Sequence, residues 1–287
     1  MESNKSGTLY LCATPIGNLG DMSPRILQTL QEADLIACED TRNSIKLLNF
    51  FDIHTPMTSY HEYNKTEKAY ELIAQMKHGK NIALITDAGT PAISDPGEVL
   101  VRLCHQEGVP VTSLPGPAAC ITALTLSGLS TRRFVFEGFL PTDKKELREV
   151  LEDLKNEKRT IIFYAPPHDL RKVLKLLSET VGDRKITICR ELTKKFETIR
   201  PTTLSEAIRQ YESEDPRGEY VLVMEGRSRE ELEAKRKADF EKTDITEHVK
   251  HYEDQGLDRK EAMKKAAADR GISKREVYQM LLDVREE

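Results

Sequence analysis

The segment Thr86–Gly97 reads TDAGTPAISDPG, and it closes a short apolar run, Ile82–Thr86, that predicts a buried strand. Gly89 allows a ligand to approach the backbone closely, and Pro91 stiffens the turn. Ser94 to Pro96 also has the composition of a helix cap, which is compatible with binding. Because open α/β sheets bind ligands beyond the carboxyl ends of their strands, this segment predicts an α/β fold with a site at the loop.

Two other loops have the same character. Ala13–Asp21, ATPIGNLGD, ends the predicted strand Thr8–Ala13, and Leu114–Ala119, LPGPAA, ends the predicted strand Val109–Leu114. Neither contains the glycine pattern of a dinucleotide site or the Gly-Lys-Ser/Thr of an ATP site, so those ligands are disfavoured. Taken alone, Ala13–Asp21 could equally be a tight turn, and Leu114–Ala119 fits structural packing better than binding.

The elements around these loops alternate in type, which indicates βαβ units and a largely parallel sheet. Leu35–Cys38 reads as a further strand. Ser23 is a predicted N-cap with Pro24 at the first helical position, and Thr66–Lys77 and Pro96–Gln106 read as further helices. We expect residues 1–128 to form an N-terminal α/β domain.

A second series of elements follows and predicts a C-terminal α/β domain over residues 129–227. The expected strands are Phe134–Phe139, Thr160–Tyr164, Lys185–Arg190 and Tyr220–Met224, and the expected helices are Asp143–Asn156, Asp169–Glu179 and Leu204–Tyr211.

The remaining residues, 228–287, are predicted to be a linker and a small helical module. Ser228–Glu241 is almost entirely charged and small, as in an exposed helix or linker. Capping-box spacing at Asp258 and again at Ser273 marks two helix starts, and Gly271 marks the end of the first helix. The layout is compatible with a helix-turn-helix.

Composition narrows the class of protein. The 287 residues are 38% hydrophobic and 32% charged, which is sufficient for a folded core. Five cysteines without CxxC spacing read as buried free thiols, and no apolar run reaches the ~20 residues of a membrane span, so we expect a cytosolic protein. A formal net charge of −5 disfavours an extended nucleic-acid footprint and by itself favours a small-molecule enzyme.

Together the three loops, in order and spacing, resemble the signature segments of the tetrapyrrole methylase family, over about Thr8 to Gly226. The resemblance implies two α/β domains, with S-adenosylmethionine bound in the cleft between them, no metal, and a homodimer. The cofactor contacts that it implies are mostly small or apolar residues: Pro15, Ala88, Gly89, Thr90, Ile93, Ala118, Ala119, Ala165 and Leu192.

Finer features resemble one branch of that family, whose members methylate the ribose 2′-oxygen of a decoding-centre cytidine of 16S ribosomal RNA (rRNA) in the small ribosomal subunit. The segments that carry this resemblance are Pro15–Asp21, Glu39–Arg42, Asp87–Gly97, Gly138–Pro141 and Arg190–Glu197. One segment departs from the branch: Phe163–Asp169 reads FYAPPHD where the branch reads FYESPHR, so contacts made there by Glu and Arg side chains are in doubt.

The reaction that the resemblance implies requires alignment of the acceptor and benefits from a base, typically by ~10²–10⁴-fold. Candidates for catalysis are Asp40, Arg42 and His61, although an N-cap role for Asp40 and a structural role for His61 fit equally well. Candidates for contact with the substrate are an acid, a tyrosine that could stack on a base, and a basic cluster that could otherwise be a solvated face: Glu39, Tyr60, Arg190, Lys194 and Lys195.

Two alternative functions remain open at this point. The acceptor could be a ring carbon of a corrin or porphyrin, which the acidic charge favours and the Glu39–Arg42 and Arg190–Glu197 segments disfavour. The protein could also be a non-catalytic RNA-binding factor of ribosome assembly, which the intact glycines of the three loops disfavour.

Overall fold

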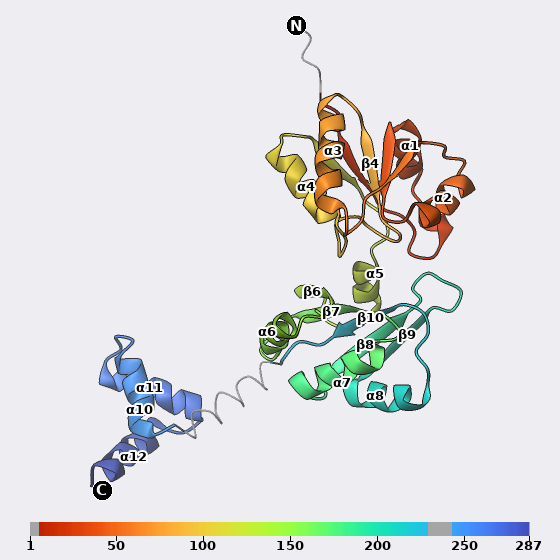
Figure 1. The fold of residues 1–287 in the computed structure, drawn as a ribbon. Coiled ribbons are helices and arrows are strands. Elements are labelled where there is room, and N and C mark those ends of the chain that lie inside the picture. The colour runs from red at the N-terminus through yellow and green to blue at the C-terminus, as the bar shows by residue number, and fades with distance from the viewer. Residues whose placement is uncertain (1–5, 229–242, 287) are drawn as a thin grey trace. The chain divides into compact units, whose positions relative to one another are not determined.

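The computed structural model describes residues 6–228 and 243–286. By its contacts the chain divides into two compact units, one of Met1–Leu151 with Thr160–Glu225 and the other of Glu152–Arg159 with Gly226–Glu287. Both sheets lie in the first unit (Figure 1). The charged segment Ser228–Glu241 lies, except for its first residue, outside the described residues. The domain boundaries expected at 128/129 and 227/228 stay predictions.

The first sheet is wholly parallel, as predicted, and its strand order is β3-β2-β4-β1-β5. Its strands are β1 (Leu9–Cys12), β2 (Leu35–Cys38), β3 (Met57–Ser59), β4 (Ile82–Ile85) and β5 (Val111–Leu114). The chain leaves β1 toward β2 on one side and returns to β5 on the other. The loops after the adjacent strands β4, β1 and β5 therefore meet at one edge of the sheet, as at a topological switch point.

Helices cover both faces of this sheet (Figure 1). On one face α1 (Pro24–Glu32) and α2 (Thr41–Phe50) bury residues such as Ile26 and Leu48. On the other face α3 (Lys65–Lys77) and α4 (Gly97–Gln106) bury residues such as Leu72 and Leu100. The predicted cap of α1 is confirmed, because the Ser23 side chain accepts the Ile26 N–H at 3.2 Å. The first unit also contains the short 3-10 helix η1 (Leu19–Asp21).

The second sheet is mixed, with the order β6-β7-β10-β8-β9. Its strands are β6 (Phe134–Phe139), β7 (Thr160–Ala165), β8 (Lys185–Arg190), β9 (Thr198–Thr203) and β10 (Tyr220–Met224), and its helices are α6 (Lys144–Leu154), α7 (Leu170–Val181) and α8 (Leu204–Ser213). Strand β10 runs antiparallel to both of its neighbours, β7 and β8. The four strands predicted here are present. The edge strand β9 was not predicted, because Pro201 interrupts its strand pattern, and a proline is tolerated only at a sheet edge.

Helix α5 (Ala119–Leu126) follows the first sheet in the chain but packs on the second. Its Cys120, Ala123 and Leu124 are buried together with side chains of β7, β8 and β10. Ile16, from the loop after β1, belongs to the same cluster. The core of the second sheet therefore includes Ile16, a residue of a loop that follows a strand of the first sheet.

All five cysteines are buried and free, as predicted. Burial raises the pKa of the Cys12 thiol to about 12, so this group stays protonated at physiological pH. No helix among the described residues is long and apolar enough to cross a membrane.

In the second unit, α10 (Ile245–Glu253), α11 (Arg259–Arg270) and α12 (Lys274–Glu286) form their own small core. Both predicted caps are present, since the side chains of Asp258 and Ser273 accept the N–H groups of residues 261 and 276. Gly271, with a φ of 65°, ends α11 as expected. The sequence indicated the starts of α11 and α12 but not α10, which packs on both.

Candidate active site

The three loops predicted to carry the site contact one another at the carboxyl edge of the first sheet. Thr14 and Gly89 exchange two backbone hydrogen bonds, of 2.8 and 3.1 Å, which join the β1 loop to the β4 loop. The Thr90 hydroxyl donates to the Pro117 carbonyl at 2.8 Å and joins the β4 loop to the β5 loop. Gly116 lies so close to the β1 loop that an added Cβ would come within 2.6 Å of Ala13 Cβ.

The β4 loop has a strained backbone that one carboxylate stabilises. Ala92 and Ser94 have φ values of 67° and 62°, which L residues rarely adopt. The Asp95 carboxylate accepts three backbone N–H groups, those of Ala92 at 3.0 Å, Ile93 at 3.1 Å and Gly97 at 2.8 Å. The loop shape therefore depends on this side chain, which also accepts the first N–H of α4, in agreement with the cap predicted for Ser94 to Pro96.

A second strained loop, after β8, faces the first from the other sheet. Glu191 and Thr193 have φ values of 51° and 66°. Lys194 follows, and its side-chain stem lies against Gly17, where an added Cβ would be 2.3 Å from Lys194 Cγ. At Gly138 of β6, an added Cβ would likewise lie 2.9 Å from the Ser94 hydroxyl oxygen. Loops from the two sheets thus meet at points where only glycine fits.

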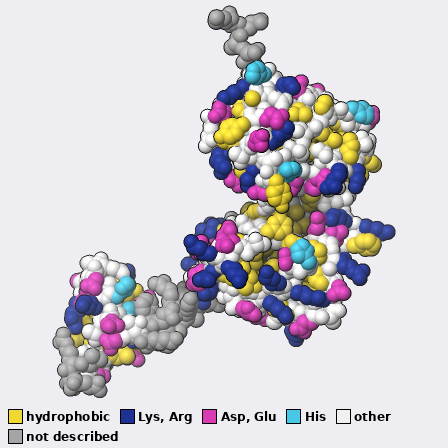
Figure 2. All heavy atoms as spheres, viewed as in Figure 1, with side chains coloured by type: hydrophobic (Ala, Val, Ile, Leu, Met, Phe, Trp, Pro, Cys, Tyr) yellow, Lys and Arg dark blue, Asp and Glu magenta, His cyan; other side chains and the backbone are white. Residues whose placement is uncertain are grey.

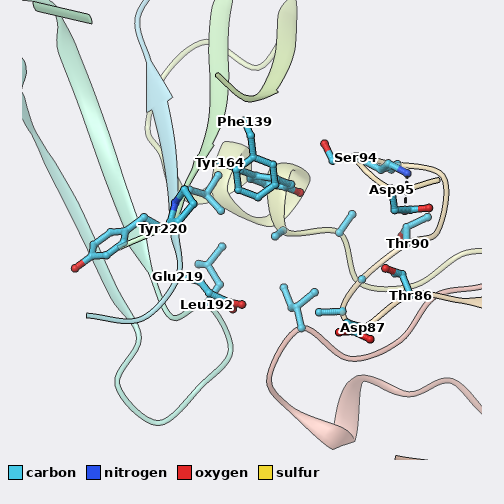
Figure 3. A pocket seen from close by; sticks show the side chains of 18 of the residues that line it. Thr86, Asp87, Thr90, Ser94, Asp95, Phe139, Tyr164, Leu192, Glu219 and Tyr220 are labelled. Atoms are coloured by element: carbon cyan, nitrogen blue, oxygen red, sulfur yellow. Dashed lines mark hydrogen bonds between the residues drawn. The ribbon is translucent and has the colours of Figure 1, made fainter. Parts of the chain in front are cut away.

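Between these loops lies a pocket of about 430 Å³ (Figure 3). Figure 2 shows hydrophobic side chains gathered where the two sheet-containing parts of the first unit meet. The pocket is lined by Ile16, Glu39, Thr86, Asp87, Ala88, Gly89, Thr90, Ile93, Ser94, Asp95, Ala118, Ala119, Phe139, Tyr164, Ala165, Pro166, Pro167, Leu192, Glu219, Tyr220 and Val221.

The positions expected to bind the cofactor fall largely on this pocket. Eight of the nine line it, namely Ala88, Gly89, Thr90, Ile93, Ala118, Ala119, Ala165 and Leu192. Pro15 is not among the lining residues, and its neighbour Ile16 takes that place. The segment Phe163–Asp169, which departs from the pattern of the branch, contributes Ala165, Pro166 and Pro167 to the lining. This wall of the pocket is therefore formed by small, apolar side chains.

Sequence reasoning missed two groups of lining residues. Phe139 and Tyr164 form an aromatic wall, with ring centroids 5.4 Å apart, and their signal was an aromatic residue at each of two strand ends. The run from Glu219 to Val221 lies at the start of β10. A parallel strand would present its carboxyl end to the site, and only the antiparallel direction of β10 brings its first residues there.

The charge of the lining is acidic. Glu39, Asp87, Asp95 and Glu219 line the pocket, and no Lys, Arg or His is found among the lining residues, all of which lie in the described part of the chain. Burial and the neighbouring Asp87 raise the pKa of Glu39 above its ordinary value. A positively charged ligand would be stabilised here, whereas a phosphate group would be repelled.

Asp40 and Arg42, predicted to act in catalysis, lie next to the pocket but do not line it. Asp40 caps α2 by accepting the Arg42 N–H at 2.8 Å, and its carboxylate also accepts two hydrogen bonds from the Arg42 guanidinium, at 3.1 and 2.8 Å. The hydrogen bonds from Arg42 lower the pKa of Asp40 to about 2, so Asp40 is a poor base near neutral pH. The structure shows the capping role that was the alternative for Asp40, and its role in catalysis stays a prediction. Arg42, with a side chain 87% exposed, was predicted to act in catalysis, and that role stays a prediction.

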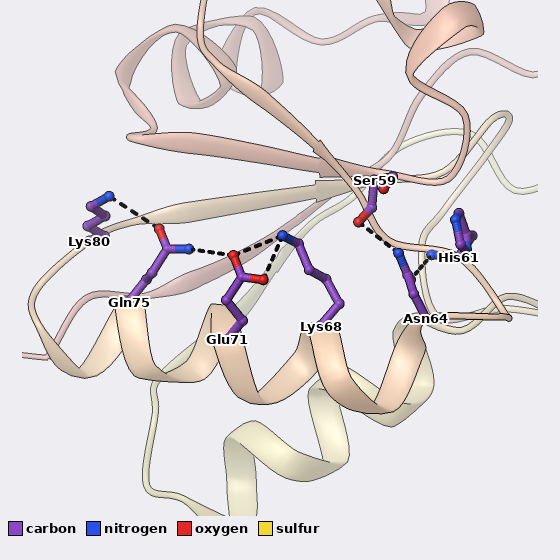
Figure 4. Close-up of polar contacts among 7 residues, drawn as sticks. All are labelled: Ser59, His61, Asn64, Lys68, Glu71, Gln75 and Lys80. Atoms are coloured by element: carbon purple, nitrogen blue, oxygen red, sulfur yellow. Dashed lines mark hydrogen bonds and ion pairs between the residues drawn. The ribbon is translucent and has the colours of Figure 1, made fainter.

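His61 and Tyr60, the two candidates after β3, differ in exposure. Tyr60 is only 1% exposed, and its hydroxyl donates to the Pro96 carbonyl at 2.9 Å. The prediction that Tyr60 stacks on a base is therefore wrong, because its ring is part of the core. His61 is half-buried and does not line the pocket; Asn64 accepts the His61 N–H at 2.8 Å and donates to the Ser59 carbonyl at 3.3 Å, which fixes the turn before α3 (Figure 4).

The basic cluster of the second sheet is partly neutralised by its own neighbours. Lys194 Nζ lies 3.0 Å from a Glu191 oxygen and 2.7 Å from a Glu219 oxygen. Arg190 donates to a backbone carbonyl, that of Arg217, at 2.6 Å. Lys195 is exposed and lies over the Phe196 ring, 5.6 Å from its centroid. Of the two lysines predicted to hold phosphate, only Lys195 is therefore well placed to do so, and Lys194 holds the loop.

The family model for tetrapyrrole (corrin/porphyrin) methylases matches residues 8–208. The match covers the three loops, both strained segments and most of the second sheet. The chain belongs to the tetrapyrrole methylase family.

Relatives of known name identify the group within this family to which the chain is most similar. Two proteins named ribosomal RNA small subunit methyltransferase I, from Bacillus subtilis (strain 168) and Halalkalibacterium halodurans, are each 47% identical to this chain. The alignments cover 95% and 96% of this chain and 93% and 95% of the relatives. A protein of the same name from Escherichia coli O157:H7 is 44% identical over 79% of this chain and 81% of its own length. Identity at this level over whole chains places these proteins and this one in a single family.

Solved structures agree on the fold. A uroporphyrin-III-C-methyltransferase from Thermus thermophilus matches with a TM-score of 0.54 and 16% identity, over 76% of this chain and 94% of its own. Diphthine synthase matches with a TM-score of 0.61 and 14% identity, over 77% and 91%. At such identities the likeness concerns the fold alone.

The Asp95 contacts generate a test of how the β4 loop is held. Asp95→Ala removes the acceptor of three backbone N–H groups, each worth about 0.5–1.5 kcal/mol. We expect amide hydrogen exchange over residues 89–97 to accelerate at least about tenfold, with little change in the strands. Glu98→Ala, at an exposed neighbouring position that pairs with Arg102, is the matched control and should leave the loop unaffected. Equal exchange in both variants would contradict this role of Asp95.

Proposed function

We propose that this protein is a methyltransferase that binds S-adenosylmethionine in the pocket of the first unit and methylates the ribose 2′-oxygen of a decoding-centre cytidine of 16S rRNA. The observation that carries the proposal is 47% identity, over nearly the full length of both chains, to proteins named for methylation of small-subunit rRNA. The pocket described above supplies the place where this chemistry would occur.

The residues present fit this cofactor. S-Adenosylmethionine carries a positive sulfonium and a positive ammonium group, and the pocket offers four carboxylates and no basic side chain among its lining residues. The aromatic wall of Phe139 and Tyr164 suits the flat adenine ring. A volume of about 430 Å³ lies within the range of small-molecule sites, which is roughly 300–1,000 Å³.

Small residues make room for that ligand. Gly89 lines the pocket with a φ of 89°, and a Cβ there would lie 3.3 Å from the Ile16 side chain. Ala88, Ala118 and Ala119 line the same wall. When bound, the cofactor supplies an electrophilic methyl group, and the task left to the protein is to orient the acceptor hydroxyl and exclude water.

For the RNA, we propose that Arg42, Arg190 and Lys195 contact phosphate at the margin of the pocket. A net charge of −5 leaves few phosphate contacts for unspecific binding. The enzyme would therefore require the shaped surface of the small ribosomal subunit for affinity. We place its action in the cytoplasm.

We further propose that the enzyme is a homodimer. The family resemblance is the main support. Helix α5 also presents apolar side chains to solvent, with Ile121 44% and Leu126 43% exposed, and such surface suits contact between protomers.

The two alternatives receive less support. Tetrapyrrole methylation is supported by the description of the family and by fold neighbours of 16–21% identity, and likeness at that level concerns the fold and not the substrate. A non-catalytic assembly factor would have no need of an open pocket walled by strained loops.

Methyl transfer to purified small subunits tests the function itself. With labelled S-adenosylmethionine, we expect one methyl group per subunit taken from a strain that lacks the enzyme, located on a cytidine ribose by mass spectrometry. Short naked oligonucleotides of the same sequence should react at least about 100-fold more slowly, because few phosphate contacts compensate for the missing surface. Methylation of a tetrapyrrole instead, or of oligonucleotides and subunits alike, would contradict the proposal.

The cofactor site is tested by Gly89→Val. The added side chain would enter the pocket near Ile16, so we expect calorimetry to show loss of S-adenosylmethionine binding in a folded protein. Gly108→Val is the matched control: its φ of 69° imposes similar strain, but nothing lies within 4 Å of its Cβ. Loss of binding in both variants, or in neither, would remove this wall from the site.

The two lysines after β8 should fail differently. Lys195→Ala removes an exposed charge, so we expect a KM for subunits raised several-fold, an unchanged kcat, and a salt dependence weaker by about one phosphate contact. Lys194→Ala breaks the pairing with Glu191 and Glu219, so we expect weaker cofactor binding and an unchanged salt dependence. Steady-state kinetics at two salt concentrations measure this. Equal salt effects in the two variants would contradict the division of roles.

A further inference from the structure

Three of the four carboxylates that line the pocket are engaged by N–H or cationic donors. Asp95 accepts three backbone N–H groups. Asp87 accepts one N–H from the N-cap of α2 at 3.3 Å and a side-chain amide from its first turn at 3.2 Å. Glu219 pairs with Lys194 at 2.7 Å. These three carboxylates are therefore engaged in holding loop backbone, the start of α2 or the Lys194 ammonium group.

Glu39 differs from the other three. Its one hydrogen bond among the described residues comes from the Thr86 hydroxyl, at 3.3 Å. The sheet explains this position, because Cys38 of β2 pairs with Ile85 of β4, so the residues that follow the two strands lie side by side. Glu39 therefore lines the pocket with a carboxylate that has accepting capacity to spare.

We propose that Glu39 is the catalytic base of methyl transfer, an inference that rests on the function proposed above. The hydroxyl oxygen forms a bond to the methyl carbon, the carbon–sulfur bond breaks with its electron pair going to sulfur, and the hydroxyl proton passes to the Glu39 carboxylate. The charges balance, since one sulfonium and one carboxylate become a neutral thioether and a neutral carboxylic acid. The proton then leaves to water.

The surroundings of Glu39 suit a group that must accept a proton. Burial is the largest cause of its raised pKa, and the facing carboxylates of Asp87 and Asp95 raise it further. The Thr86 hydrogen bond and the facing His61 lower the pKa of Glu39. The net shift is upward, which brings the carboxyl group closer to the pH at which a base is most effective.

The two other candidates are worse placed. Asp40 does not line the pocket. Its carboxylate accepts two hydrogen bonds from the Arg42 guanidinium, and its pKa is about 2. His61 also lies outside the lining, and its Nδ1 is buried without a hydrogen-bond partner among the described residues.

The experiment is single-turnover methyl transfer to small subunits as a function of pH. The wild-type rate should fall as pH decreases through the Glu39 pKa, because only the carboxylate accepts a proton. Glu39→Gln should lower the plateau rate by about 10²–10⁴-fold and remove this acidic limb. S-Adenosylmethionine affinity by calorimetry should fall by much less than the rate, because three of the four lining carboxylates remain. Glu98→Gln, at an exposed position on α4, is the control and should match the wild type.

A second variant tests the base without removing it. Thr86→Val keeps the shape of the side chain but deletes the hydroxyl that stabilises the charged carboxylate, so the Glu39 pKa should rise. The acidic limb of the pH profile should therefore move to higher pH. A purely structural role would lower the rate at every pH and leave the limb in place.

The outcomes separate the two levels of the proposal. An active wild type together with a Glu39→Gln rate within tenfold of it, or an unmoved limb in Thr86→Val, would overturn the Glu39 assignment alone. A wild type that binds no S-adenosylmethionine and methylates no subunit would overturn the proposed function and the assignment with it.

Discussion

The pair of backbone hydrogen bonds between Thr14 and Gly89 is the contact on which the site depends. It forms beyond the ends of two adjacent parallel strands, where a sheet has no further ladder to hold its loops together. The close approach requires Gly89 at a φ of 89°, and the Thr90 bond to Pro117 then draws in the third loop. These hydrogen bonds fix the start of the β4 loop. The strained segment that Asp95 holds is thereby positioned against the second sheet.

Much of the first half of the molecule could be predicted because its signals are local. Four short apolar runs gave four parallel strands, and small residues after three of them marked the loops that line the pocket. The same reasoning failed where partners are distant in sequence. The burial of Tyr60 depends on Pro96, the commitment of Lys194 depends on Glu219, and the contribution of Glu219 to the pocket depends on the direction of β10. The local sequence pattern around each of these residues does not indicate which distant residue it contacts.

The pocket is lined by negative charges, whereas the proposed RNA contacts are positive. The two charges suit their two ligands, a cationic cofactor and a phosphate backbone. A cationic methyl donor is stabilised by carboxylates, and the same carboxylates repel phosphate from the place where the donor binds. Two basic side chains proposed to contact RNA, Arg42 in the first turn of α2 and Lys195 on the turn after β8, are exposed and do not line the pocket. A ribose can thus be admitted while its flanking phosphates stay outside.

The position of α5 has a consequence for biosynthesis. The helix leaves the ribosome directly after the first sheet, but the strands that bury its Cys120 and Leu124 are completed only at Met224 of β10, about a hundred residues later. At ~5–20 residues per second, an apolar helix stands without its partner for on the order of 5–20 s. During that interval the nascent chain presents a surface that a chaperone could bind, and the first sheet cannot complete its pocket until the second has been made.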